Sequence, residues 1–353
     1  MKAFETGEYR NLFAECGILQ EDIDRKLKRI VDTFFYGNEQ ERIFHPVGED
    51  MGYLEDTGNH DARTEGMSYG MMFCVQLDMK EEFDRIWKWA KTYMYTKLGD
   101  NENEGYFAWS CTTDGEGIFN YSHEAQEILR AMVHKGSNGR DGAPMFNNEN
   151  HYILFVPGSD YTDPSYHLPH FYELFALWAY KEDRPFFKEA ARASREYLAK
   201  ACHPVTGLNP EYGEFDGSPM SRPLRWTKFH HDYFYSDSYR TVANIALDYE
   251  WFGIDVGQVD AVRRQQEFIL EKEKEDAIGI YKIDGELVEK GVLHPVGLMA
   301  ATAQGALATT GALQETWVRK FWEMELREGG RRYYDNCLFL FAFLALSGNY
   351  RIW

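Results

Sequence analysis

The stretch DARTEGMSYGMMFCVQLDM, residues 61–79, changes character near its start. Its first residues are charged or polar and lead to a glycine, whereas the rest is apolar and rich in methionine. An acidic residue just before an apolar run is typical of the first turn of an α-helix. We therefore expect a helix over 66–79, apolar on more than one side, with Glu65 at its start.

Helical periodicity of this kind dominates the chain. Apolar residues recur with a spacing near 3.6 in 21–37, 66–79, 82–97, 122–135, 169–181, 184–201, 235–252, 257–272, 296–309, 312–326 and 332–347. The best strand signal is HYILFVP, residues 151–157. Evenly spaced helices without a linker predict an all-α fold, a single domain over 1–353 built as a toroid of helical hairpins. An α-solenoid and two helical domains are the alternatives.

Composition limits the possible partners. The chain has 353 residues, of which 44% are hydrophobic and 27% charged, as in soluble globular proteins. A net charge of −19 without a basic run argues against nucleic acid and anionic membranes as partners. Aromatic residues make up 16%, and we expect most of them in the core and some in a cleft, stacked on sugar rings.

The cellular compartment is predicted from the first residues and the cysteines. The start MKAFETGEYRNLF has no apolar segment of the kind found in signal peptides. No apolar run approaches the ~18 residues of a membrane span. The five cysteines are scattered without a CxxC pair, so we expect reduced, mostly buried thiols in a cytoplasmic protein.

Several acidic, aromatic-rich stretches lead directly into predicted helices. They are HDARTEG, CTTDGEG, YTDPSYHLPHFYE and HHDYFYSDSYR. In a toroid of helical hairpins the loops at one end share a face. We therefore expect carboxylates from distant parts of the chain to converge there.

Glu65 has two interpretations. A carboxylate in a first helical turn interacts favourably with the helix dipole, and local sequence alone favours this capping role. The alternative is a general acid. The dipole and Arg63 both favour the ionised form, so a general acid here needs burial or nearby carboxylates to keep its proton.

Asp237 and Asp114 are the other candidate acids. Asp237 lies where the chain enters the helix predicted at 235–252, and Arg240 can pair with it on the same helical face. Such a pair keeps a carboxylate ionised, as a base requires. Asp114 lies in CTTDGEG, where an Asp-Gly turn is the simpler reading, and local sequence does not separate it from Glu116.

Other chemistries lack their motifs. The sequence contains no HExxH, P-loop or GxSxG pattern, and no GxGxxG follows a strand. We therefore expect neither a metal nor a cofactor, and we place the histidines of the His230–His231–Asp232 cluster in a loop network or beside a substrate. Acidic loops together with many aromatic residues suit hydrolysis of a glycosidic bond, which usually requires two carboxyl groups.

The segment TEGMSYGMMF, residues 64–73, resembles the motif of glycoside hydrolase family 8 that carries the proton donor. DSYR at 237–240 resembles the family's base segment, and TDGE at 113–116 resembles the segment whose Asp binds the central sugar. The resemblance implies an (α/α)6 barrel and an inverting mechanism. It implies Glu65 as general acid and Asp237 as general base.

Three further stretches resemble one branch of that family, which releases xylose from the reducing end of oligoxylans. They are FYSDSYR, DPSYHLPHFYELFALWA and LHPVG. By this resemblance Asp114 holds a distorted sugar, Tyr172 orients the attacking water and Trp109 stacks on a sugar. His294 helps close the cleft beyond the reducing-end sugar, so that one xylose leaves at a time.

The resemblance thus predicts a cytoplasmic hydrolase of short β-1,4-xylo-oligosaccharides. The oligomeric state stays open. Three alternatives remain: an endo-acting β-1,4-glycanase of the same family, a sugar epimerase with a toroid fold, and a non-catalytic oligosaccharide-binding protein. Product size, isomerisation without cleavage, and binding without turnover distinguish them.

Overall fold

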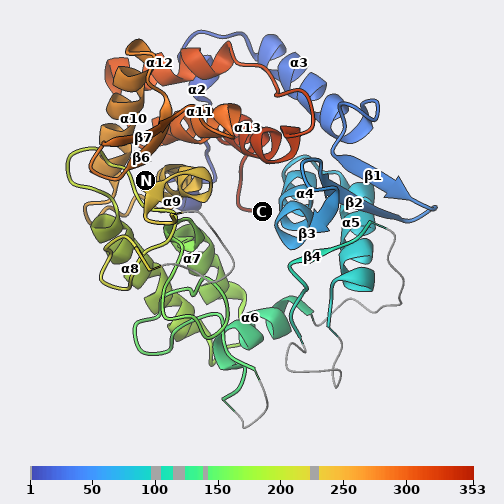
Figure 1. Cartoon of the computed structure of the whole chain (residues 1–353). Helices are drawn as coiled ribbons and strands as arrows, with labels where there is room; N and C mark the ends of the chain where they lie inside the picture. Colours follow the sequence, from blue (N-terminus) through green and yellow to red (C-terminus); the bar gives the residue numbers. More distant parts are fainter. Residues whose placement is uncertain (1, 97–104, 114–123, 138–141, 223–229) are drawn as a thin grey trace. The chain divides into compact units, whose positions relative to one another are not determined.

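The computed structural model describes residues 2–96, 105–113, 124–137, 142–222 and 230–353. The chain forms two compact units. The first unit comprises Met1–Glu8 and Leu129–Phe321, and the second comprises Tyr9–Ile128 and Trp322–Trp353. Helices predominate in both units, and Figure 1 traces them in sequence order.

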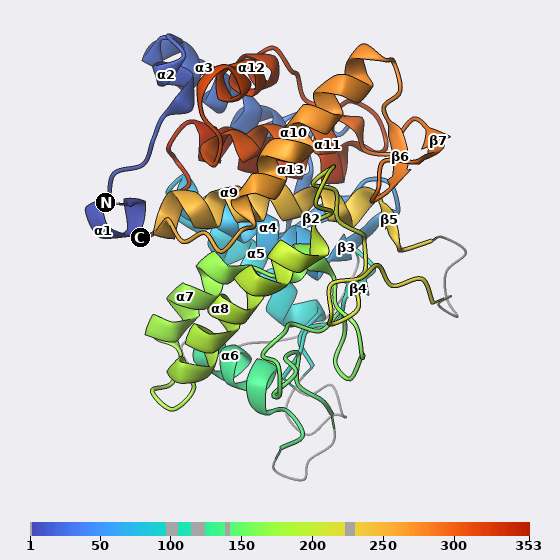
Figure 2. The same cartoon turned by 90° about the vertical axis from the view of Figure 1, so that its left-hand side faces the viewer.

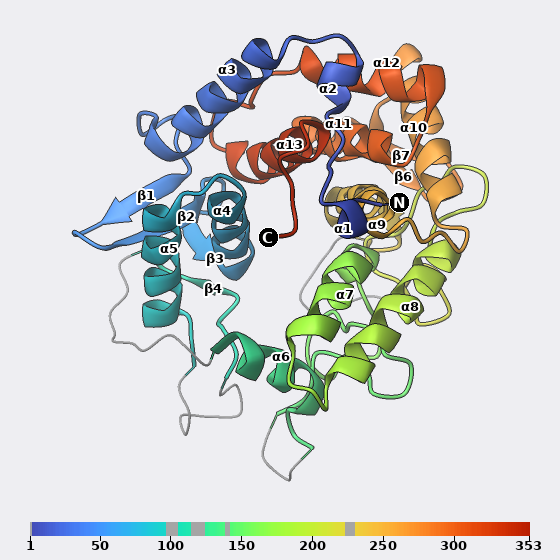
Figure 3. The ribbon, with the colours of Figure 1, turned by 180° about the vertical axis from the view of Figure 1, so that it is seen from behind.

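The second unit combines helices with a four-stranded antiparallel sheet in the order β1-β2-β3-β4. Its elements are α2 (Leu12–Glu15), α3 (Gln20–Val31), the π-helix η1 (Asp32–Tyr36), β1 (Phe44–Val47), β2 (Met51–Asp56), β3 (Asp61–Arg63), α4 (Thr64–Gln76), α5 (Lys80–Tyr93), β4 (Ser110–Cys111) and α13 (Arg332–Leu346). Helix α4 packs against α5, β2 and α13, and Figure 3 shows α4 beside α5. Phe73 of α4 contacts Phe34 and Phe341, so an aromatic core fixes this helix.

The first unit is built around a group of packed helices. Its elements are α1 (Ala3–Thr6), η2 (Pro164–Tyr166), α7 (Pro169–Trp178), α8 (Arg184–Ala201), β5 (Tyr233–Phe234), η3 (Ser236–Tyr239), α9 (Arg240–Phe252), α10 (Val259–Lys274), β6 (Gly279–Lys282), β7 (Leu287–Lys290), α11 (Pro295–Gln304), η4 (Gly305–Leu307) and α12 (Gly311–Trp322), the last of which ends one residue beyond the unit. Helix α6 (Glu124–His134) crosses the boundary between the units. Helices α7 and α8 run side by side (Figure 2), and α9 packs against α7, α10 and α11.

A buried ion network links three of these helices. Arg195 of α8 makes two hydrogen bonds to Asp248 of α9, at 2.8 and 2.7 Å, and one to Glu173 of α7 at 2.8 Å. Removing one member of such a network leaves an uncompensated buried charge, which costs about 3–5 kcal/mol. The network therefore holds α7, α8 and α9 in one arrangement.

The predicted helices are confirmed, most with shifts of a few residues at their ends. The prediction 184–201 coincides with α8. The prediction 21–37 divides into α3 and η1, and 235–252 divides into η3 and α9. The part of 122–135 before residue 124 lies outside the described residues.

The strand predicted at 151–157 is wrong. Ile153 makes only an isolated bridge to Phe146, and the segment otherwise has an irregular path. Its apolar residues Tyr152, Ile153 and Leu154 are buried. The segment is apolar because it packs into the core, and a run of this length does not distinguish a strand from a buried loop.

The five cysteines are free, and Cys74, Cys202 and Cys337 are buried. In the described part of the chain no helix has both the length and the apolar character that crossing a bilayer requires.

Candidate active site

Glu65 lies in the first turn of α4, immediately after the short strand β3. Arg63 is the N-cap residue and has an extended backbone, with φ −115° and ψ 144°. The Thr64 backbone N–H donates to the carbonyl oxygen of Trp109 at 3.0 Å. The start of the helix is therefore tied to the segment that carries Trp109.

Two tyrosine hydroxyls hold the Glu65 carboxylate. Tyr69, one helical turn later, donates to Oε1 at 3.1 Å, and Tyr333 of α13 donates to Oε2 at 3.2 Å. Burial and the nearby negative charge of Glu65 raise the pKa of Tyr333 well above its usual value, so this hydroxyl keeps its proton. Each carboxylate oxygen thus has a fixed donor, which orients the group.

The glycines next to Glu65 make this arrangement possible. A Cβ atom on Gly66 would lie 2.8 Å from the Tyr333 hydroxyl oxygen, and a Cβ atom on Gly70 would lie 2.4 Å from Leu54 Cδ1. Only glycine allows both the tyrosine and the neighbouring strand to approach this closely. The spacing Glu65-Gly66-x-x-Tyr69-Gly70 therefore has a physical cause in this structure.

Arg63 contacts two aspartates near the start of α4. Its Nη1 lies 3.1 Å from Asp56 Oδ2, and its Nε lies 3.1 Å from Asp61 Oδ1. The guanidinium also lies 4.7 Å from the ring centroid of Trp109, a cation–π contact. The Trp109 side chain is nevertheless 67% exposed, so much of its surface is accessible to a ligand.

Asp114 and its neighbour Glu116 lie outside the described residues. Strand β4 ends shortly before them and pairs with β3, where Ala62 faces Cys111 and Arg63 faces Ser110. The choice between the two carboxylates stays a prediction.

Asp237 lies in the single turn η3, between β5 and α9. The preceding residue, Ser236, has a positive φ of 42°, which is uncommon for a residue other than glycine. Backbone and side-chain bonds between Tyr235 and Ser238 close the turn around it. Backbone strain of this kind persists only where the surroundings fix it, and it often occurs at functional sites.

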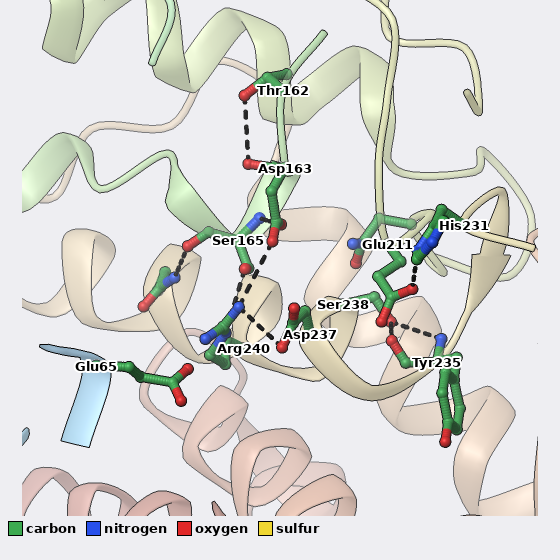
Figure 4. Close-up of polar contacts among 12 residues, drawn as sticks. Glu65, Thr162, Asp163, Ser165, Glu211, His231, Tyr235, Asp237, Ser238 and Arg240 are labelled. Atoms are coloured by element: carbon green, nitrogen blue, oxygen red, sulfur yellow. Dashed lines mark hydrogen bonds and ion pairs between the residues drawn. The ribbon is translucent and has the colours of Figure 1, made fainter. Parts of the chain in front are cut away.

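The expected pair between Asp237 and Arg240 is confirmed. Arg240 Nη2 lies 3.1 Å from Asp237 Oδ1, and the Asp237 side chain is 30% exposed. The same guanidinium reaches Asp163 Oδ2 at 3.5 Å, and its Nε donates to Ser165 Oγ at 3.2 Å. Figure 4 shows Arg240 between the two aspartates. The structure thus brings together two of the acidic stretches that the sequence singled out, 161–173 and 230–240.

Asp163 is fully buried and accepts the Ser165 backbone N–H at 2.7 Å. Burial raises the pKa of Asp163 to about 8, partly opposed by Arg240 and reinforced by the negative charge of Asp237. Asn244 donates to the Ser165 carbonyl at 2.9 Å, so α9 also fixes this loop.

Glu211 and His231 form a second pair beside Asp237. His231 Nδ1 lies 2.6 Å from Glu211 Oε2 (Figure 4). Burial raises the pKa of Glu211, as does the charge of Asp237, whereas the His231 contact and the Asp237 backbone N–H lower it. The neighbouring His230 lies 3.7 Å from Asp232. Of the two places expected for these histidines, the contacts fit a loop network, and a place beside a substrate stays a prediction.

Tyr172 and His294 have different surroundings. Tyr172 of α7 is buried, and its hydroxyl donates to the Tyr166 carbonyl at 2.7 Å. Burial raises the pKa of this hydroxyl. His294 is partly exposed and is the N-cap residue of α11, next to Leu293, which is exposed. The roles assigned to both residues stay predictions.

Sequence reasoning missed four residues around the two acids. Asp163 lies in a singled-out loop, and Tyr69 lies four residues after Glu65, so both had a local signal. Glu211 and Tyr333 had none, because each reaches its acid only through the fold. Within the described ranges no group of three His, Cys, Asp or Glu side chains is arranged to hold a metal ion.

Known proteins closely resemble this chain. The family model Glycosyl hydrolases family 8 matches residues 49–127, which include Glu65. A "reducing end xylose-releasing exo-oligoxylanase" of Halalkalibacterium halodurans is 48% identical, over 99% of this chain and 96% of that protein. Rex8A of Paenibacillus barcinonensis, named a reducing-end xylose-releasing exo-oligoxylanase, is 46% identical, over 99% and 98% of the two chains.

Solved structures agree with the sequence comparison. A mutant of Rex8A from Paenibacillus barcinonensis, complexed with an α-L-arabinofuranosyl-xylotetraose, superimposes with a TM-score of 0.93 at 45% identity. The match covers 99% of this chain and 98% of that one, and it confirms the all-α, (α/α)6 fold class. With relatives this similar over nearly their full length, the chain belongs to glycoside hydrolase family 8.

Proposed function

We propose that this enzyme releases xylose from the reducing end of short β-1,4-xylo-oligosaccharides with inversion at the anomeric carbon. Two relatives at 48% and 46% identity carry the name of that activity. A solved relative holds a substituted xylotetraose, a ligand of the proposed class. We also propose that the protein acts in the cytoplasm, on short oligomers.

The observation that carries the proposal is the environment of Asp237. Its carboxylate is paired with Arg240 at 3.1 Å and is still 30% exposed. The guanidinium favours the ionised form, and the exposure lets a water molecule reach the carboxylate. A general base in an inverting glycosidase needs both properties, because it removes a proton from the attacking water.

Glu65 serves as the general acid in this proposal. Its orientation by Tyr69 and Tyr333 fixes the direction in which it gives a proton to the leaving oxygen. Water activated by Asp237 adds to the anomeric carbon as the glycosidic C–O bond breaks. The leaving oxygen takes the proton of Glu65, and Asp237 takes the proton of the water.

The remaining predicted residues bind substrate. Trp109, which is largely exposed, stacks on a sugar ring, and Asp114 holds the sugar whose bond is cleaved. Tyr172 orients the water, and Arg240 keeps Asp237 charged. Leu293 and His294 close the cleft after one sugar, so that each cleavage removes a single xylose.

The decisive experiment uses xylotriose labelled at its reducing end. Labelled xylose is the expected first product. NMR should detect the inverted anomeric configuration at the new reducing end of the unlabelled xylobiose, because the attacked carbon belongs to that product. Labelled xylobiose as the first product would overturn the reducing-end assignment, and mixed short products from a long xylan would favour an endo-acting enzyme.

Two variants test the assigned residues. Glu65→Gln and Asp237→Asn should each lower kcat by at least about a thousandfold, since each removes one of the two carboxyl groups that the reaction requires. Circular dichroism checks that each variant remains folded. Near-normal turnover in either folded variant would refute its catalytic role.

A further inference from the structure

The segment that carries Asp237 rests on a buried carboxylate, Glu211. The Glu211 backbone N–H donates to the Tyr233 carbonyl at 2.9 Å, and that of Tyr212 donates to the His231 carbonyl at 2.8 Å. Two stretches distant in sequence are thus joined by backbone bonds just before Asp237. These bonds place the Glu211 side chain beside the turn that holds Asp237.

The Glu211 side chain holds this turn directly. The Asp237 backbone N–H interacts favourably with the Glu211 carboxylate, and His231 Nδ1 lies 2.6 Å from Glu211 Oε2. The His231 ring stacks on Tyr212, with ring centroids 4.2 Å apart and planes 9° from parallel. Both side chains of the Glu211–His231 pair are about nine-tenths buried, so the pair has a fixed geometry.

Other charged groups also face this region. Asp163 is buried on the far side of Arg240, and Arg240 pairs with Asp237 itself. The Tyr212 hydroxyl lies near Asp237, Glu211 and Asp163, whose negative charges, after burial, raise its pKa. Glu211 therefore belongs to a group of neighbouring acidic side chains in which Arg240 is the cation.

We infer that Glu211 is a positioning residue for Asp237. It fixes the backbone of the base through the Asp237 N–H, and its charge, balanced by His231, alters how easily Asp237 ionises. The inference rests on the proposed role of Asp237 as the base. It assigns a function to two residues that do not themselves touch the reacting atoms.

The pH dependence of turnover separates this role from a merely structural one. Glu211→Gln keeps the shape of the side chain and removes its negative charge, so Asp237 ionises more easily. The acid limb of the kcat/KM profile should then move to lower pH by at least about 0.5 unit. Because the turn is less firmly held, kcat should also fall about tenfold with little change in KM.

His231→Gln should shift the profile in the opposite direction. The change replaces an ionisable partner of Glu211 by a neutral one, which leaves the charge of Glu211 less balanced beside Asp237. The acid limb should therefore move to higher pH. His230→Gln is the matched control, because His230 is the adjacent histidine, is 67% exposed and contacts Asp232 at 3.7 Å.

Opposite shifts in the two variants, with an unchanged profile in the control, support the inference. Acid limbs within about 0.2 pH unit of the parent in both variants, or shifts in the same direction, would overturn it. If one variant does not fold, the direction in which the acid limb moves in the other variant still tests the inference. A folded Asp237→Asn variant with normal turnover would instead refute the proposed role of Asp237. Failure of the inference on Glu211 and failure of the proposed function are therefore distinguishable.

Discussion

Replacing Tyr333 by phenylalanine tests how the protein controls Glu65. The change removes the hydroxyl that donates to Oε2 at 3.2 Å and leaves the ring in place. Tyr69 still donates to Oε1, so the carboxylate keeps one of these two donors. The tyrosine ring is buried, and the variant should fold.

The expected magnitude follows from the lost hydrogen bond. A bond to a charged group contributes about 1.5–3 kcal/mol, and we take the lower value because Glu65 is only partly buried. One pH unit corresponds to about 1.36 kcal/mol. A donor to the carboxylate favours the ionised form, so its loss lets Glu65 keep its proton to higher pH. The basic limb of the pH–rate profile should therefore rise by about one unit.

The kcat of the Tyr333→Phe variant at neutral pH should fall, even though its basic limb moves to higher pH. The carboxyl group loses a donor that orients it, and a barrier increase of about 1.4 kcal/mol corresponds to a tenfold lower kcat. Tyr9→Phe is the matched control, since it removes a hydroxyl that bonds the backbone of Ile352. A basic limb and a kcat for Tyr333→Phe that equal those of the control would refute the reasoning.

Three further predictions concern residues around the two acids. Gly66→Ala should lower both the Tm and kcat, because its Cβ would lie 2.8 Å from the Tyr333 hydroxyl; calorimetry and kinetics that match the parent would contradict this. Trp109→Ala should raise KM for xylotriose about tenfold, or ~1.4 kcal/mol, with an unchanged Tm, since the ring is largely exposed; an unchanged KM would argue against sugar stacking. The pKa of Asp163 is raised to about 8 in the folded protein, against about 3.9 in the unfolded chain. The contribution of Asp163 to the free energy of unfolding is therefore full below pH ~4 and is lost as the pH rises to about 8. Asp163→Asn cannot titrate, and its Tm should fall less between pH 5 and pH 8 than that of the parent; parallel Tm curves would contradict the shift.

The helices were predictable because their signal is long and repeats. Helix α8 shows it clearly: an apolar stripe over 18 residues gave both of its ends. The strands were not predictable in the same way. Strands β3 to β5 have two or three residues each, too few for an alternating pattern, and their partners are distant in sequence. The apolar run at 151–157 looked more like a strand than any of them, yet it packs as an irregular segment.

The candidate site was predictable only where its residues are local. The pair Asp237–Arg240 is three residues apart, so helical geometry alone predicts it. Tyr333 donates to a residue 268 positions earlier, and no pattern near Glu65 indicates it. Gly66 was the one local indication of that contact. A glycine in the first turn of a helix allows another side chain, here Tyr333, to approach the backbone closely.

The two proposed catalytic acids occupy the same local setting with opposite chemical demands. Each follows a short strand and lies in the first turn of the next helical segment, Glu65 after β3 and Asp237 after β5. This position favours a negative charge, which assists a base and hinders an acid. The side chains around Asp237 include Arg240, a cation, whereas the donors to the Glu65 oxygens include the neutral hydroxyls of Tyr69 and Tyr333. Neutral donors orient a carboxyl group without the strong bias of a cation toward ionisation, so these two tyrosines suit an acid and Arg240 suits a base.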